Sequence, residues 1–189
     1  YEETQQLLDK LAVSSPKLIK GLIPDLLSLG AVTKVMQALL NENVPVVDIR
    51  TIVETLAQAA SKTKDPNELL TTVRIALSRM ITQRIVDVDN ELPIITLQPE
   101  LEGLLTNAVN SSEQGGAGIE PNMAENLQQS LQTIYKQQEQ AQQPAVLVVQ
   151  PSLRTLLARF VRNISSNMYV LSYHEIPDNK QVRIVGTVG

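Results

Sequence analysis

The feature that most constrains the fold is a strand–helix–strand pattern in residues 145–171. Residues 145–149 (AVLVV) form an unbroken apolar run rich in β-branched side chains, which is typical of a strand covered on both faces. Pro151 follows at a position that suits the first turn of a helix. Apolar residues then recur at helical spacing: Leu153, Leu156, Leu157, Phe160, Val161 and Ile164. Residues 168–171 (MYVL) predict a second strand, so the stretch predicts a right-handed βαβ unit.

The rest of the second half predicts further elements around this unit. Residues 92–97 and the alternating residues 182–188 predict two more strands, giving a sheet of roughly four strands. A short helix around residues 101–105 and a long helix from Asn122 are expected to cover the sheet face that the βαβ helix leaves open. Three arginines lie off the apolar stripe and are expected to stay in solvent: Arg154, Arg159 and Arg162.

The first half predicts helices only. Amphipathic and capping patterns predict them over these ranges: 2–12, 16–23, 32–40, 48–60 and 66–85. Asp48 and Asp65 are the expected N-caps of the last two, and Gly30 is expected to end a helix that precedes Val32. An acidic junction follows at residues 87–91.

These patterns predict a two-lobed α+β protein. Residues 1–86 form an all-helical N-terminal subdomain, and residues 87–189 form an α/β subdomain with the sheet and its covering helices.

Composition excludes several functions. The 189 residues include no cysteine, which excludes disulfides and thiolate metal sites. Residues 1–86 carry ten Lys/Arg against nine Asp/Glu (+1), and residues 87–189 carry six against eleven (−5), which sum to the net charge of −4. An acidic second half and an aromatic content of 3% disfavour nucleic-acid binding. No apolar run approaches the roughly 20 residues that span a bilayer, and Tyr1 in place of a start methionine indicates a piece of a longer protein.

Individual motifs give no sign of catalysis. His174 is the only histidine and has no Ser, Cys or second His arranged with it, so we expect a surface residue in a turn. The glycine-rich residues 115–118 lack the lysine of a phosphate-binding loop and predict a plain loop. Residues 32–60 are similar to a helix-turn-helix, but the outer face of the second helix is neutral. We therefore expect no catalytic residue, no metal ligand and no cofactor.

Four stretches together resemble one protein family. Residues 43–57 (NVPVVDIRTIVETLA), 65–79 (DPNELLTTVRIALSR), 153–162 (LRTLLARFVR) and 170–177 (VLSYHEIP) are similar, in order and spacing, to motifs of the FlhA/InvA (FHIPEP) export-gate family of type III secretion. The resemblance covers nearly the whole chain and is greatest to the flagellar members.

This resemblance implies a non-enzymatic component of protein export. The two lobes would be the third and fourth cytosolic subdomains of a ring of identical copies, at the cytoplasmic face of the bacterial inner membrane. Contact with the membrane would be made only by an N-terminal half outside this chain. The implied partners are chaperone–substrate complexes, the export ATPase complex and the substrate-specificity switch protein.

The resemblance also suggests two groups of protein-interaction residues. The first group is Val44, Pro45, Val46, Asp48 and Arg50. The second group is Tyr173, His174, Glu175, Ile176 and Pro177. Three alternatives stay open: a virulence (injectisome) homologue, a helix-turn-helix regulator that binds nucleic acid, and an enzyme fragment whose active site is completed by other sequence.

Overall fold

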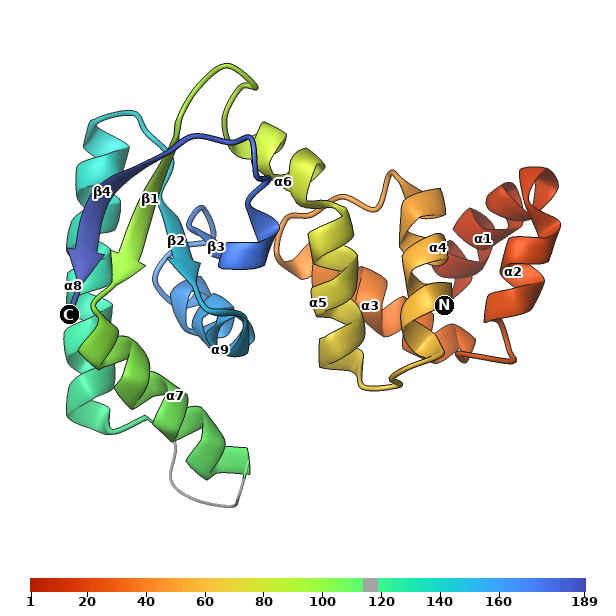
Figure 1. Ribbon diagram of the computed structural model, residues 1–189, viewed down its shortest axis with the longest axis horizontal. Helices are drawn as coiled ribbons and strands as arrows, with labels where there is room; N and C mark the ends of the chain where they lie inside the picture. Colours follow the sequence, from red (N-terminus) through yellow and green to blue (C-terminus); the bar gives the residue numbers. More distant parts are fainter. Residues whose placement is uncertain (114–118) are drawn as a thin grey trace. The chain divides into compact units, whose positions relative to one another are not determined.

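A computed structural model describes residues 1–113 and 119–189 (Figure 1). Its contacts divide the chain into two compact units, Tyr1–Ile81 (unit 1) and Thr82–Gly189 (unit 2). The division falls inside helix α6 (Ser78–Ile85), ahead of the acidic junction. Unit 1 is helical and unit 2 adds a four-stranded sheet, which confirms the predicted α+β class.

Unit 1 packs amphipathic helices around a leucine-rich core. Before α6 it contains α1 (Glu2–Ser14), α2 (Pro16–Leu22), α3 (Leu29–Asn41), α4 (Ile49–Ala60) and α5 (Pro66–Ala76). Asp48 caps α4 by accepting a hydrogen bond from Thr51 N, and Asp65 caps α5 by accepting one from Asn67 N, so both predicted caps are confirmed. The largest fully buried side chains of this core are Leu8, Leu22, Leu39, Ile52, Leu56 and Leu69.

Two details of unit 1 differ from the prediction. Gly30 lies in the first turn of α3 rather than at the end of an earlier helix, because the Ser28 side chain caps α3 by accepting a hydrogen bond from Ala31 N at 3.1 Å. The single helix expected over residues 66–85 is two helices, α5 and α6. The Leu77 amide, just after α5, donates both to Val73 O at 3.0 Å, as in an α-helix, and to Arg74 O at 3.1 Å, a tighter contact that marks the break between the two helices.

Unit 2 is built on a parallel sheet in the order β3–β2–β1–β4. The strands are β1 (Leu92–Leu97), β2 (Val146–Val149), β3 (Tyr169–Ser172) and β4 (Val182–Val188). The register of β1 against β4 shifts between Ile94 and Ile95, whose partners are Ile184 and Gly186. Val185 is thus the extra residue of a bulge. The predicted strands and the βαβ unit are confirmed.

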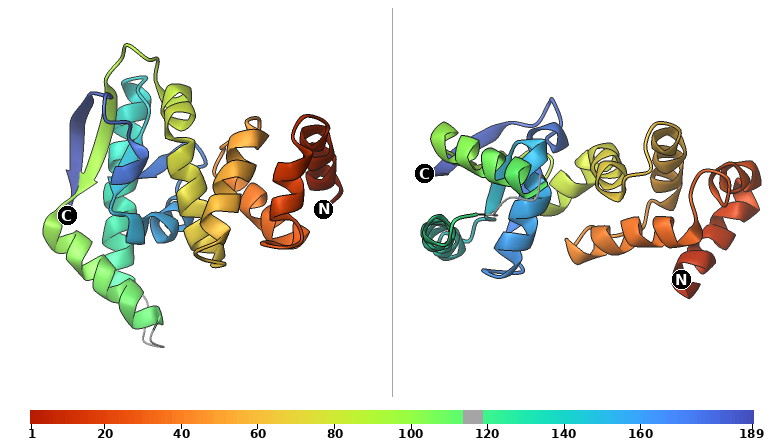
Figure 2. Two further views of the ribbon diagram at one scale, coloured as in Figure 1. Left: turned by 45° about the vertical axis from the view of Figure 1, so that its right-hand side comes forward. Right: turned by 90° about the horizontal axis from the view of Figure 1, so that it is seen from below.

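All three helices that follow β1 share one face of this sheet. They are α7 (Pro99–Glu113), α8 (Pro121–Gln140) and α9 (Pro151–Arg162). One hydrophobic cluster joins Leu105 of α7, Leu131 of α8 and Leu157 of α9 to Ile95 and Leu147 of the sheet. Figure 2 (right) shows α8 and α9 on the same side of the strands.

The prediction that α7 and α8 cover the face opposite α9 is therefore wrong. The steps from β1 to β2 and from β2 to β3 run in the same direction across the sheet. Right-handed crossovers in one direction place their helices on one face.

The segment after β1 is more helical than predicted. The short helix expected around residues 101–105 extends over Pro99–Glu113, and its Leu104 is 56% exposed. Residues 111–113 belong to α7. Residues 114–118, which include the glycine-rich residues 115–118 expected to form a loop, lie outside the described part of the chain.

Candidate functional site

The connection between α3 and α4 carries the first group of predicted interaction residues. The Val44 amide donates to Leu39 O at 2.9 Å, and the Val44 side chain is only 4% exposed. Pro45 and Val46 are half-buried, whereas Val47, which was not in the predicted group, is 76% exposed. Val44 thus anchors the connection in the core of unit 1, and Val47 presents the largest apolar surface to solvent.

Asp48 and Arg50 shape the start of α4. The Asp48 carboxylate accepts hydrogen bonds from Thr51 N at 3.2 Å and from Thr51 Oγ1 at 2.6 Å. Arg50 Nε lies 3.0 Å from Glu54 Oε1, and both side chains are exposed. Because Glu54 neutralises Arg50, this helix face offers little positive charge to a nucleic acid.

The second group of predicted residues follows β3 in unit 2. Tyr173–Glu175 form a single 3₁₀ turn, η1. Tyr173 is 47% exposed, and its hydroxyl donates to Glu102 Oε1 of α7 at 3.3 Å. Partial burial raises the pKa of the Tyr173 phenol above the usual value of 10.0, and the negative charge of Glu102 and its hydrogen bond raise it further.

Glu175 has a structural role in unit 2. Its carboxylate accepts a hydrogen bond from Ser172 N at 3.2 Å and lies 4.0 Å from Arg154 Nε, with the two side chains 1% and 3% exposed. The expectation that Arg154 stays in solvent is therefore wrong, since a buried carboxylate holds the guanidinium inside. Sequence reasoning missed this pair, although Ser172 and Glu175 have the spacing of a capping box, in which the glutamate carboxylate accepts a hydrogen bond from the serine backbone amide, as it does here.

The remaining residues of the second group lie at the surface or near it. His174 is exposed, and Ile176 and Pro177 are half-buried. Within the described residues, His, Asp and Glu side chains form no group of three or more that can hold a metal ion. Along the same residues, no helix combines the length and the apolar content that a bilayer span requires.

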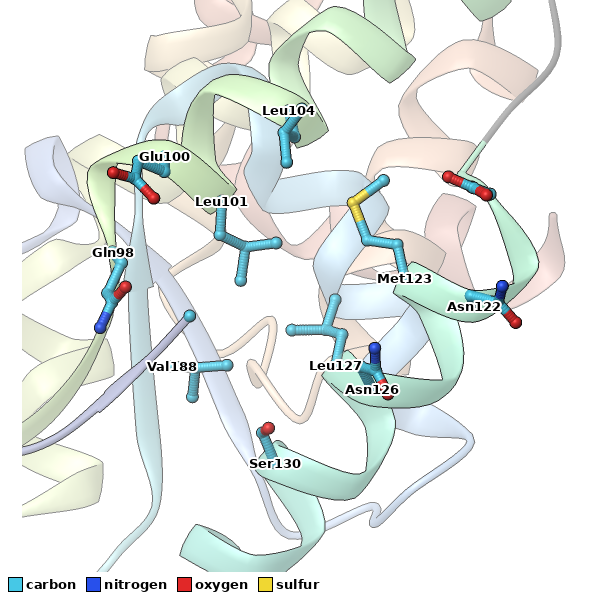
Figure 3. Close-up of a pocket in the computed structure, with 12 residues that line it drawn as sticks. Gln98, Glu100, Leu101, Leu104, Asn122, Met123, Asn126, Leu127, Ser130 and Val188 are labelled. Atoms are coloured by element: carbon cyan, nitrogen blue, oxygen red, sulfur yellow. The ribbon is translucent and has the colours of Figure 1, made fainter.

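A pocket of about 420 Å³ lies in unit 2 between α7 and α8, beside the carboxyl ends of β1 and β4 (Figure 3). Its apolar lining is Leu101, Leu104, Met123, Leu127 and Val188. Its polar lining includes Gln98, Glu100, Glu120, Asn122, Asn126 and Ser130. Ligands commonly bind beyond the carboxyl ends of parallel strands. None of the predicted interaction residues lines this pocket. The exposure of Leu104 could not be recognised from the sequence, because its helical spacing with Leu101 indicated a buried side chain.

Comparison with known proteins identifies the family of the chain. The FHIPEP family model matches residues 1–181. Flagellar biosynthesis protein FlhA of Escherichia coli (strain K12) is 43% identical and that of Yersinia enterocolitica is 44% identical, each over 188 residues. Each match covers all of this chain and 27% of the relative, so the chain spans about a quarter of the length of these relatives.

Solved structures have the same fold over nearly the whole chain. The cryo-EM structure of nonameric EPEC SctV-C has a TM-score of 0.87 at 27% identity and covers 99% of this chain and 56% of that one. The nonameric EscV cytosolic domain from the type III secretion system has a TM-score of 0.85 at 28% identity and covers 100% of this chain and 55% of that one. These matches confirm the resemblance that the sequence motifs indicated, and the chain belongs to the FHIPEP family.

Proposed function

We propose that this chain is part of the export gate of a flagellar type III protein-export apparatus. The observation that supports this most directly is the 43% identity to E. coli FlhA, which extends over the whole of this chain. Its two units would be the third and fourth cytosolic subdomains, at the cytoplasmic face of the inner membrane, joined to the membrane by sequence outside this chain.

Unit 1 would form contacts between neighbouring copies in a ring. The related SctV-C and EscV structures are nonameric, at 27% and 28% identity to this chain. The exposed Val47 and the half-buried Pro45 and Val46 provide a small apolar surface beside the α4 cap. A ring requires two different patches on each copy, and this surface would supply one of them.

Unit 2 would serve as a docking surface for export partners. The proposed partners are chaperone–substrate complexes, the export ATPase complex and the substrate-specificity switch protein. The exposed rings of Tyr173 and His174 and the excess of acidic residues, eleven Asp/Glu against six Lys/Arg in residues 87–189, suit transient polar contacts. This role is non-enzymatic and uses neither catalytic residue nor cofactor.

A chimera of E. coli FlhA tests the proposal. The segment of FlhA that matches this chain is replaced by residues 1–189 in a strain lacking FlhA, and export of flagellar proteins into the medium is measured with motility. Restored export is expected, and FlhA lacking the segment serves as the control. A chimera that accumulates normally in the membrane and exports nothing would contradict the proposal.

A virulence type III apparatus is the alternative, because EscV comes from a type III secretion system. The identity of 28% to EscV against 43% to FlhA favours the flagellar role. A matching EscV chimera that restores secretion, beside an FlhA chimera that does not, would reverse this assignment. Retention of the chain on heparin with steep salt dependence would instead support a nucleic-acid-binding regulator.

A further inference from the structure

We propose that the pocket between α7 and α8 is a docking groove for an amphipathic peptide segment of a partner protein, one that carries Lys or Arg beside an apolar anchor. This inference deepens the docking role proposed for unit 2 and rests on it. It names the place on unit 2 and the chemistry of the segment that binds there.

The apolar lining is arranged as two helical rows. Leu101 and Leu104 are three residues apart on α7, and Met123 and Leu127 are four residues apart on α8, so each pair lies on one side of its helix. Figure 3 shows the two rows on opposite sides of one open space. Leu101 and Met123 are half-buried, and Leu104 is 56% exposed.

Such an arrangement accepts the apolar face of an amphipathic helix. Peptide helices bind grooves through anchors at helical spacing, and the flexible methionine side chain adapts to different anchors. A volume of about 420 Å³ suits a few side chains rather than a folded domain. The side chains of Asn122, Asn126 and Ser130 follow one another along α8 and offer hydrogen bonds at the edge of the groove.

The negative charge of the groove lining determines which kind of peptide segment it favours. Among the described lining residues the ionisable side chains are Glu100 and Glu120, both acidic and both exposed. A cationic side chain beside the apolar anchor therefore meets a complementary potential, and an acidic segment is repelled. This complementarity favours a segment rich in Leu and Lys or Arg over a neutral or acidic one.

The first test uses a synthetic Leu/Lys amphipathic helical peptide and this chain with ¹³C-labelled methionine methyl groups. The Met123 methyl signal is expected to shift on titration, while the signal of Met36, which is buried in unit 1, stays in place. A scrambled peptide of the same composition and a Leu/Glu helical peptide are the controls. An unmoved Met123 signal, or an equal shift with either control peptide, would overturn the proposal.

Variants then locate the site by fluorescence anisotropy of the labelled peptide. Leu104→Ser is expected to weaken binding about 10-fold, because it removes an exposed apolar contact without disturbing the core. Glu100→Gln combined with Glu120→Gln is expected to weaken binding and to reduce its salt dependence. Ile184→Ser, at a 63% exposed residue of β4 outside the lining, is the matched control. Unchanged binding by Leu104→Ser would exclude the groove.

The peptide test and the export test fail separately. Peptide binding is measured on this chain alone, whereas the export role is measured by the FlhA chimera. If export is restored but no peptide binds, the docking groove is contradicted and the export role stands. If peptide binds but the chimera does not restore export, the export role is contradicted and the groove stands.

Discussion

A methyl group placed on Gly186 of β4 would lie 3.1 Å from Cδ1 of Ile134 in α8. Gly186 immediately follows the bulge of β4, and the lack of a side chain lets α8 approach the strand closely there. The contact lies between a backbone position and the far end of a flexible side chain, so limited adjustment is possible.

Gly186→Ala is expected to lower the free energy of unfolding by about 1 kcal/mol through overpacking. Ile134→Val removes the Cδ1 methyl group that the alanine would meet, so the cost of Gly186→Ala should largely vanish in that background. Denaturant unfolding of the two single variants and the double variant measures this coupling. Additive effects would show that the close approach is not what requires glycine.

Glu175→Gln is expected to destabilise the protein by about 3–5 kcal/mol, because it leaves the buried guanidinium of Arg154 without its carboxylate. Combining Glu175→Gln with Arg154→Met should cost less than the sum of the single changes. Glu139→Gln, at an exposed position of α8, is the control and should stay within about 0.5 kcal/mol of the parent. A similar small effect of Glu175→Gln in chemical unfolding would refute the structural role of the pair.

Tyr173 is expected to ionise above pH 10.0, since burial and Glu102 raise its pKa. Its folded pKa exceeds the unfolded one, so its stabilising contribution is complete below the unfolded pKa and is lost as pH rises through the folded pKa. Glu102→Gln should move the ionisation toward pH 10.0. An NMR titration of the tyrosine rings, with Tyr173→Phe to assign the signal, measures this. An unchanged pKa in Glu102→Gln would exclude the carboxylate as a cause.

Val47→Glu is expected to prevent ring assembly of a longer chain that includes the upstream subdomains, while this chain alone stays monomeric. Val47 is 76% exposed, so the charge should leave the fold intact, whereas a charge at the buried Val44 would disrupt the core. Light scattering measures assembly, and Val13→Glu, at an 87% exposed residue of α1, is the control. Rings formed by this chain alone, or by the Val47→Glu longer chain, would contradict the proposed interface.

Residues 1–86 and residues 87–189 are expected to fold as separate pieces. Each contains its own buried cluster, with Leu39, Ile52 and Leu56 in the first and Leu131 and Leu147 in the second. Both pieces should show a cooperative melting transition by circular dichroism and protected amides in hydrogen exchange. If either piece shows no cooperative melting transition, the boundary between the two folding units lies elsewhere in the chain.

The sequence predicted elements whose signals are local. Strand and helix positions follow from apolar periodicity, and the caps at Asp48 and Asp65 follow from side chains that bind nearby backbone amides. The face of the sheet covered by α7 and α8 was not predictable in this way. It depends on the spatial order of β1, β2 and β3, which no single segment contains.

The candidate sites, too, were predictable only where the signal lies within one short segment. Residues 44–47 are all apolar, so their pattern could not separate the buried Val44 from the exposed Val47. Arg154 was assigned to solvent because it lies off the apolar stripe of its helix. Its burial could not be foreseen, since the carboxylate that holds it comes from a turn beyond the next strand. The groove was missed because only a short helix around residues 101–105 was predicted, and its leucines, including the exposed Leu104, were expected to be buried.

The pairing of β1 with β4 determines when unit 2 can fold during translation. Leu92 pairs with Val182, so β1 cannot pair with β4 until nearly all of unit 2 has been synthesised. Contacts so distant in sequence form slowly, and β1 keeps an open edge until β4 arrives. A nascent chain stalled before Val182 should therefore need a chaperone at that edge, and release of the last strand should remove this need.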